Sequence, residues 1–595
     1  MPLANEHTPS PAGPFRSAPL ADFRTDARVL LLTLLALVAG TISSFVAQGL
    51  LWLISAITNL AFFQRWSAAP AIPAEHNLGA WVIAVPVAGA LIIGLMARYG
   101  SEKIRGHGIP EALEAILLGK SRIQLKVALL KPLSSAISIG SGGPFGAEGP
   151  IIMTGGAFGS LFAQRFHLSA AERKTLLVAG AAAGMSAIFA TPVAAALLAV
   201  ELLLFEWKPR SFIPVAAAAL VASVWRPLLM GSGPIFPVAA HDMPGGSLVG
   251  FAAILGLLTG FGSGLLTLLV YAFEDLFQKL PCHWMWWPAI GALAVGIGGW
   301  FDPRVLGVGY ETIHEMLRGN FAGTAIAGFM IVKALVWSVA LGSGTSGGVL
   351  APLLLMGGAL GALVSPWIPG GDAGMWALTG MTAMMAGTMR APLTSLVFAV
   401  ELTHDFRLFP VLLAASVAAL AVTVLVMRRS ILTEKLARRG HHITREYSID
   451  PFEFARVGDV MDRDAATVLS SMKVTELADS IAAGDPALTK RQATLIVDNA
   501  GELLGIITRG DIVEALRRPD VESLTVGDAG TSHPAVTYPG ETLHDALQKM
   551  LALDVGRLPV VDEKSRSRIA GYLGRASILS ARLRWHEEEN IRQRG

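Results

Sequence analysis

The stretch Gly140-Ser-Gly-Gly-Pro-Phe-Gly-Ala-Glu-Gly-Pro150 decides the fold, because Gly342-Ser-Gly-Thr-Ser-Gly-Gly-Val-Leu-Ala-Pro352 repeats its outline. Both stretches begin with Gly-Ser-Gly and end in proline, and their first residues lie 202 positions apart (140 and 342). A second pair of motifs recurs at nearly the same spacing: Thr191-Pro192 followed by Glu201, and Ala391-Pro392 followed by Glu401. Chance recurrence of glycine in apolar sequence explains one such pair more easily than two in register, so the spacing predicts an internal repeat.

The composition indicates that these repeats lie in a lipid bilayer. Of the 595 residues, 53% are hydrophobic and 15% are charged, against about 25% charged in ordinary soluble proteins. Charge is sparse from about Val29 to Met427 and dense after Arg428, which predicts a membrane-embedded body followed by a soluble tail. The formal net charge of +2, without a long basic tract, gives no indication of nucleic-acid binding. Cys282 is the one cysteine, which excludes an intrachain disulfide.

Many apolar segments of the body are shorter than the roughly 20 residues that a membrane-spanning helix needs. Glycine and proline interrupt them often, and helices broken in this way expose their ends at membrane depth, where transporters place binding sites. The polar start up to Arg28 lacks the pattern of a signal peptide, so we expect the first segment to be an uncleaved span. The candidate segments are Val29–Leu60, Trp81–Ala97, Leu125–Ile139, Ile151–Phe162, Leu176–Phe189, Val193–Phe205, Phe212–Met230, Leu248–Leu268, Met285–Phe301, Phe321–Leu341, Val349–Val364, Met375–Met389, Leu393–Leu402 and Phe409–Met427.

Three clusters of glycine and proline stand at the starts of apolar helical segments: Gly106-His-Gly-Ile-Pro110, Gly146-Ala-Glu-Gly-Pro150 and Gly348-Val-Leu-Ala-Pro352. Glycine allows close approach of the backbone, and proline suits the first helical turn, where no amide donor is needed. The first N–H groups of a helix lack internal partners and carry partial positive charge. Several such ends that converge would hold an anion without a full counter-charge, weakly enough for its release.

Two charged residues lie in or beside these apolar segments. A carboxylate inside the membrane, such as that of Glu148, is costly and indicates function. At a helix start it would compete with an anion for the same donors, and its protonation would free the site; the alternative is an acid that only complements the helix dipole. Lys131 either raises the local positive potential or extends to the membrane interface.

The three clusters, in this order, resemble those of the CLC family of chloride channels and chloride/proton antiporters, over about Arg28–Gly440. The resemblance implies an α-helical polytopic membrane protein with inverted repeats and broken helices, a homodimer with one pore per subunit, and transport of chloride without a required cofactor. It also implies that Glu148 is the gate. No paired acid and base, nucleophile or metal-ligand set in the sequence indicates an enzyme. The anion-binding residues that the resemblance implies are Gly106, His107, Gly108, Ile109, Pro110, Gly146, Ala147, Gly149, Gly348, Val349, Leu350 and Leu432.

The sequence departs from the family pattern at three positions. His107 replaces the usual serine and Leu432 the usual tyrosine, so both hydroxyl ligands are absent. An imidazole N–H can donate to an anion and its protonation lies near physiological pH; alternatively, His107 is only a wall of the pore. Leu202 stands where antiporters often carry a second glutamate, which favours a voltage-gated-type channel over a chloride/proton antiporter. A non-conducting membrane nucleotide sensor is a further alternative, and the three converging anion-type clusters count against it. We expect the neighbouring Glu201, like its repeat mate Glu401, to be structural.

After Arg428 the sequence alternates between strand-like and helix-like segments. Ala493–Asp498 and Leu504–Ile507 are predicted to be strands around a turn, and Leu558–Asp562 and Ile569–Leu573 repeat the pattern. This alternation resembles a tandem of cystathionine-β-synthase (CBS) domains, which have an α/β fold.

Such pairs often bind adenine nucleotides, ATP or AMP, between the repeats. In the matching motif, Thr508 and Asp511 would meet phosphate and ribose, whereas the second repeat has Gly574 and Ser577. A packing module without a ligand is the alternative.

The predicted organisation follows from these segments. Positive flanks mark the cytoplasmic side, and Arg24 and Arg28 precede the first span while Arg428 and Arg429 follow the last. We therefore expect a multi-pass protein of the cell inner (plasma) membrane with both termini in the cytoplasm. The predicted parts are a cytoplasmic segment (1–27), the transmembrane domain (28–440), a linker (441–455), two CBS domains (456–518 and 519–584) and a tail (585–595).

Overall fold

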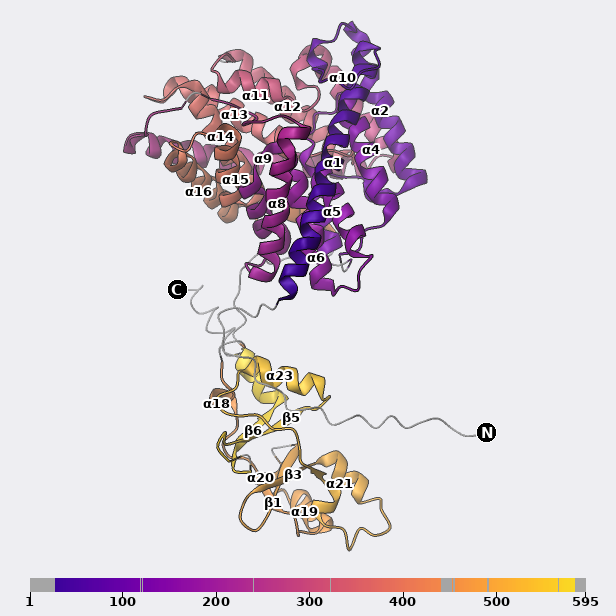
Figure 1. Ribbon diagram of the computed structural model, residues 1–595, viewed down its shortest axis with the longest axis vertical. Coiled ribbons are helices and arrows are strands. Elements are labelled where there is room, and N and C mark those ends of the chain that lie inside the picture. The colour runs from indigo at the N-terminus through magenta and orange to yellow at the C-terminus, as the bar shows by residue number, and fades with distance from the viewer. Residues whose placement is uncertain are drawn as a thin grey trace. The chain divides into compact units, whose positions relative to one another are not determined.

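The computed structural model describes residues 27–583, apart from 118, 120, 239, 322, 440–451, 453–454, 490–491 and 566. The predicted tail 585–595, most of the linker and all but the last residue of the segment 1–27, including Arg24, therefore lie outside the described residues. The chain divides into two units, Met1–Glu446 and Tyr447–Gly595, which are described separately (Figure 1).

The first unit consists of two successive sets of helices and a final short helix, α17 (Ile431–Arg438). The first set is α1 (Arg28–Phe63), α2 (Ala84–Leu95), α3 (Ile109–Leu117), α4 (Leu125–Gly140), α5 (Glu148–Ala163), α6 (Ala170–Phe189), α7 (Pro192–Leu198) and α8 (Pro209–Leu229). The second set is α9 (Gly246–Gln278), α10 (Trp287–Phe301), α11 (Tyr310–Leu317), α12 (Thr324–Gly342), α13 (Leu350–Val364), α14 (Ala373–Met389), α15 (Pro392–Thr403) and α16 (Phe409–Val426). Short 3₁₀ or π turns extend or connect them: η1 (Pro73–Glu75), η2 (Gly79–Ile83), η3 (Met96–Gly100), η4 (Glu102–Ile104), η5 (Ala199–Leu204), η6 (Trp284–Trp286), η7 (Pro303–Val305) and η8 (Ser365–Trp367).

The two sets pack in the same way, which confirms the predicted repeat. Helix α5 packs on α6 as α13 packs on α14, and α1 packs on α8 as α9 packs on α16. Across the sets, α2 contacts α10 and α7 contacts α15. Gly146 and Gly348 exchange backbone hydrogen bonds, with N···O distances of 3.3 Å from Gly146 N and 2.9 Å from Gly348 N. The two sets are therefore related by a local two-fold axis that passes between these glycines.

Reciprocal contacts of two glutamates strengthen this relation. The Glu201 carboxylate accepts from the N–H of Leu393 and Thr394 at the start of α15, at 3.3 and 2.9 Å. The Glu401 carboxylate accepts from the N–H of Val193 and Ala194 at the start of α7, at 3.0 and 2.8 Å. Each glutamate thus satisfies unpaired amides of the other repeat, and the expectation that both are structural is confirmed.

Glycines allow the central helices to approach closely. A Cβ atom on Gly155 of α5 would overlap the carbonyl oxygen of Gly180 on α6, and one on Gly357 of α13 would overlap that of Gly380 on α14. Small residues at such contacts are typical of membrane helices, which associate by close packing. Seven of the described helical segments are long and apolar enough to cross a membrane, and α3, α7 and α11 are too short to do so. The prediction of broken helices is confirmed.

The second unit contains two small sheets with helices. Strand β1 (Thr467–Leu469) pairs in parallel with β2 (Ala493–Val497), which pairs antiparallel with β3 (Leu503–Thr508), and β3 pairs with β4 (Thr531–Ser532). The other sheet joins β5 (Arg557–Val561) to β6 (Ile569–Gly574). The four strands predicted from the sequence are therefore confirmed. The helices are α18 (Val457–Val460), α19 (Val474–Ala482), α20 (Pro486–Thr489), α21 (Arg509–Ala515), α22 (Val526–Ala529), α23 (Leu543–Ala552) and a helix at 575–583.

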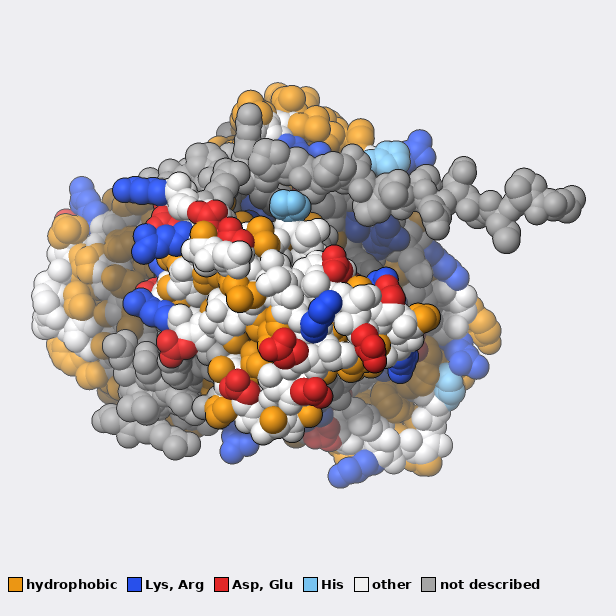
Figure 2. Space-filling view, turned by 90° about the horizontal axis from the view of Figure 1, so that it is seen from below, with side chains coloured by type: hydrophobic (Ala, Val, Ile, Leu, Met, Phe, Trp, Pro, Cys, Tyr) orange, Lys and Arg blue, Asp and Glu red, His pale blue; other side chains and the backbone are white. Residues whose placement is uncertain are grey.

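The two halves of this unit are joined by reciprocal backbone bonds. The N–H of Val457 donates to Glu541 O at 2.9 Å, and the N–H of Val526 donates to Met472 O at 2.8 Å. The first helix of each half is thus anchored to the other half. Figure 2 shows acidic, basic and apolar side chains together on the face of the molecule that is seen from below.

Candidate functional site

Three chain segments meet near the local two-fold axis. Helix α5 begins at Glu148, α13 at Leu350 and α3 at Ile109, so each Gly/Pro cluster lies at a helix start, as predicted. A Cβ atom on Gly149 would lie 3.1 Å from Gly348 Cα and would overlap the carbonyl oxygen of His107. Residues of all three clusters are therefore in direct contact, and side chains larger than glycine would separate them.

The Glu148 side chain lies at the centre of this arrangement and is fully buried. A Cβ atom on Gly348 would lie 2.8 Å from its Oε2 atom. Among the described residues, neither carboxylate oxygen has a hydrogen bond of acceptable geometry, although the N–H of Ala351 and the hydroxyl of Tyr310 are close enough to interact with the carboxylate. The carboxylate thus occupies a buried cradle formed by helix starts, where a small anion would find the same donors.

Tyr310, at the start of α11, was not among the residues predicted from the sequence. Its hydroxyl is buried and, within the described part of the chain, makes no well-formed hydrogen bond. Its ring packs edge-on against Phe189 at 6.4 Å and Phe236 at 5.8 Å between centroids. The internal repeat could have indicated Tyr310, because Gly307-Val-Gly-Tyr310 corresponds to Gly106-His-Gly-Ile109 of the first cluster.

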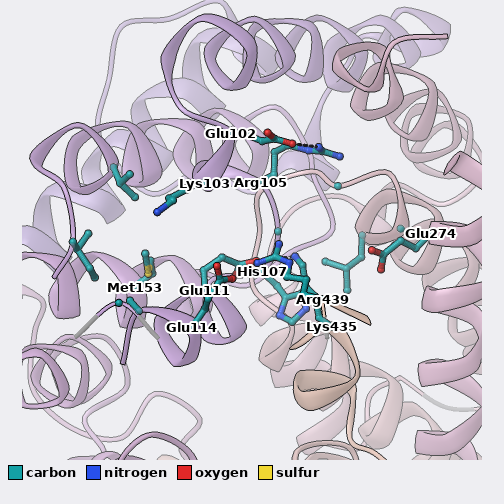
Figure 3. A pocket seen from close by; sticks show the side chains of 18 of the residues that line it. Glu102, Lys103, Arg105, His107, Glu111, Glu114, Met153, Glu274, Lys435 and Arg439 are labelled. Carbon is teal, nitrogen blue, oxygen red and sulfur yellow. Dashed lines mark hydrogen bonds and ion pairs between the residues drawn. The ribbon is translucent and has the colours of Figure 1, made fainter. Parts of the chain in front are cut away.

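On the side of α3, His107 lines a cavity of about 720 Å³ (Figure 3). The His107 side chain is only 4% exposed, and its Nδ1 atom has no hydrogen-bond partner among the described residues. An unpaired imidazole nitrogen at the edge of a cavity is able to contact a small polar ligand or ion. The charged residues that line the same cavity are Glu102, Lys103, Arg105, Glu111, Glu114, Arg122, Glu274, Lys435 and Arg439.

Ion pairs organise the wall of this cavity. Lys435 Nζ lies 2.7 Å from Glu111 Oε1, and Glu111 Oε2 accepts from the Gly108 N–H at 2.7 Å. Arg439 pairs with Glu114 beside them. Gly108 has a φ of 94°, which favours glycine, so the Glu111 carboxylate fixes an otherwise flexible turn next to His107. The helix α17, which carries Lys435, is thereby tied to the start of α3.

Lys131 does not extend to the membrane interface; that alternative is wrong. Its side chain is fully buried, and Nζ donates to the carbonyl oxygens of Ile104 and Gly106 at 2.8 and 2.7 Å. Buried carbonyl groups need donors, and the turn before α3 offers two. Lys131 therefore places a positive charge behind the first cluster and fixes its backbone.

Two further residues of the sequence prediction are buried and apolar. Leu432 lies on α17, which packs on α3 and α14, and belongs to the main hydrophobic core. Leu202 is fully buried in η5, next to the structural Glu201. Neither residue contributes a polar group to the site.

Thr508 and Asp511 lie in the other unit and form a capping box at the start of α21. The Thr508 N–H donates to Asp511 Oδ2 at 2.7 Å, and the Asp511 N–H donates to Thr508 Oγ1 at 3.2 Å. These bonds satisfy two amides at the helix start, so the two residues have a structural role whether or not a nucleotide binds.

The fold and the site define a helical membrane protein of two inverted repeats with an anion-type cradle between them. The family model described as "Voltage gated chloride channel" matches residues 88–424, and the CBS domain model matches 457–518 and 526–584. The chain belongs to this chloride channel family, and the resemblance seen in the sequence is confirmed.

Relatives and solved structures agree with this assignment. Proteins of Escherichia coli named voltage-gated ClC-type chloride channel ClcB are 31% identical over 426 residues, which cover 68% of this chain and 99% of theirs. The crystal structure of a slow cyanobacterial Cl⁻/H⁺ antiporter is similar with a TM-score of 0.61 and 21% identity, covering 70% of this chain and 98% of the antiporter. A eukaryotic CLC transporter gives 0.54 and 21%, covering 92% of this chain and 97% of its own.

Proposed function

We propose that this protein transports chloride or a similar small anion across the membrane and that Glu148 gates the path. The observation that carries this proposal is the buried Glu148 carboxylate at the meeting point of α5 and α13. A carboxylate at these helix starts occupies the place that an anion would take, so a transported anion must displace it. The names of the E. coli relatives support chloride as the transported ion.

The anion path in this proposal runs from the Glu148 cradle to the cavity at His107. Its lining comprises the backbone of the three clusters, with Ala147, Val349 and Leu350 at the two helix starts. Binding by partial charges rather than by a full positive charge keeps the anion mobile. Protonation of Glu148 removes its charge and allows it to leave the cradle, so acid conditions favour the open path.

We favour channel-like conduction over exchange with protons. Leu202 is apolar and fully buried, and the adjacent Glu201 is engaged by amides of α15. Neither residue therefore offers an unpaired carboxylate as a second proton carrier. The similar cyanobacterial structure is that of a Cl⁻/H⁺ antiporter, so exchange with protons is the competing hypothesis.

Purified protein in liposomes tests both hypotheses. With a chloride gradient and a pH electrode outside, we expect chloride efflux without stoichiometric proton uptake. Proton uptake against its own gradient would instead identify an exchanger. Absence of any anion flux would overturn transport and favour a membrane-bound sensor.

For the second unit, we propose regulation by an adenine nucleotide bound near Thr508 and Asp511. The support is the CBS family match over both repeats. Calorimetry of the whole chain with ATP and AMP should detect binding, and Asp511→Asn, which keeps a capping oxygen, should weaken it. Thr542 and Asp545 form a hydrogen-bonded pair at another helix start, with Asp545 N–H donating to Thr542 Oγ1 at 3.1 Å, so Asp545→Asn is the matched control. No binding by the unmodified chain would remove the proposal.

We also propose a homodimer in the inner membrane with both termini in the cytoplasm. Arg28 opens α1 and Arg428 and Arg429 follow α16, and positive flanks favour the cytoplasmic side. Accessibility of a cysteine placed at either end to an impermeant reagent, in intact and opened cells, tests the orientation.

A further inference from the structure

The path described above lacks the serine and tyrosine hydroxyls that the family usually supplies, because His107 and Leu432 replace them. The structure places a different hydroxyl beside the cradle. Tyr310 Oη is buried close to the Glu148 carboxylate, and both groups lack a well-formed hydrogen bond among the described residues. Unpaired buried polar atoms cost stability, so two of them in the same small region indicate a site that a bound ion or a small shift of either side chain would complete.

We propose that the Tyr310 hydroxyl is the side-chain donor of the anion cradle at Glu148. It donates to the Glu148 carboxylate when the gate is closed, and to the transported anion when the carboxylate has left. The inference rests on the proposed function, since it assigns a ligand to that same path.

The surroundings of Tyr310 suit this role. Its ring is fixed by edge-on contacts with Phe189 and Phe236, and Phe189 in turn contacts Phe398 at 5.1 Å between centroids. All three phenylalanines are fully buried. The hydroxyl hydrogen can turn toward either acceptor while the ring keeps these contacts.

A phenol is also a suitable donor for release. It carries no charge, so together with the N–H of Ala351 it holds an anion without a buried counter-ion.

The test uses Tyr310→Phe, which removes one oxygen atom and keeps the ring. Because the ring and its contacts are kept, the variant should still fold, and thermal unfolding in detergent verifies this. Tyr99→Phe, the same change on a side chain that is 77% exposed, is the control. Flux into liposomes is measured against pH. Loss of a hydrogen bond to a charged group destabilises the closed gate, so acid activation should shift to higher pH by about one unit in Tyr310→Phe.

A second arm separates the anion from the gate. In a Glu148→Ala background, Tyr310→Phe should weaken chloride binding about tenfold, as expected for loss of one hydrogen bond to an ion. Bromide soaked into crystals of Glu148→Ala should appear within hydrogen-bond distance of Tyr310 Oη. An unchanged pH profile together with unchanged binding, or bromide bound away from Tyr310, would overturn the inference while leaving anion transport intact. Absence of flux in the unmodified protein would overturn the proposed function and this inference with it.

Discussion

Lys131 in the first repeat and Lys333 in the second are both fully buried, and each donates to two carbonyl oxygens in the turn before a short helix. Glu201 and Glu401 are likewise equivalent, because each accepts hydrogen bonds from backbone amides of the other repeat. At the helix starts the repeats differ. The corresponding residues are Glu148 and Leu350, His107 and Val308, and Ile109 and Tyr310.

The two repeats therefore share the residues that support the backbone and differ in the polar residues at the proposed anion path. Residues that satisfy backbone groups occur twice, because each copy of the fold contains the same unpaired amides and carbonyls. The polar groups that face the proposed anion path occur once, on one repeat or the other. A single anion path needs only one gate. The second repeat can therefore have Leu350 at the position that corresponds to Glu148.

The second unit shows the same contrast on a smaller scale. Its halves are joined by equivalent backbone bonds from Val457 and Val526. The capping pair Thr508 and Asp511 belongs to one half, and the other half has Gly574 at the first of these positions.

The largest effect is expected for the two buried lysines, and it tests whether they are equivalent in the two repeats. Replacement of Lys131 or Lys333 by methionine leaves two buried carbonyl oxygens without donors, at about 1–3 kcal/mol for each oxygen. We expect both variants to lose stability to a similar extent, measured by thermal unfolding in detergent. If one of them unfolds at the temperature of the unmodified protein, the two lysines are not equivalent scaffold residues.

A smaller effect is expected for the glutamates. Glu201→Gln and Glu401→Gln retain an acceptor oxygen but lose its charge, so each should cost about 1 kcal/mol. Chloride flux and its pH dependence should be the same in both variants. A change in proton movement confined to Glu201→Gln would show that this residue carries protons and would break the symmetry.

The smallest effect concerns His107. In a Glu148→Gln background, His107→Ala should weaken chloride binding about threefold, since one neutral donor is lost. Val308→Ala, the matched change in the other repeat, should leave the affinity unchanged. Equal affinities in the two variants would make His107 a wall of the pore rather than a ligand.

The sequence predicted the repeat, the helix starts and the strands of the second unit, because these depend on local spacing and on glycine, proline and apolar patterns. It did not distinguish the two roles of Lys131, since snorkelling and burial require the same side chain beside an apolar segment. Tyr310 was missed for a related reason. A tyrosine after Gly309 is unremarkable in sequence, and only the fold brings its hydroxyl to Glu148 from a helix more than a hundred residues away.

The pairing of Glu111 with Lys435 was also beyond the sequence analysis. These residues are 324 positions apart, and an ion pair at that separation follows from the packing of α17 on α3. The three Gly/Pro clusters therefore predicted where the proposed anion path lies, whereas the side-chain contacts along it depend on the tertiary structure.

The proposal that Glu148 gates the anion path is tested most directly by the pH dependence of chloride flux. The unmodified protein and Glu148→Gln are reconstituted into liposomes and measured side by side. Glutamine mimics the protonated carboxyl group and does not titrate. Flux in the unmodified protein should rise as the pH falls, and flux in Glu148→Gln should be high and independent of pH. If Glu148→Gln keeps the pH dependence of the unmodified protein, Glu148 is not the gate.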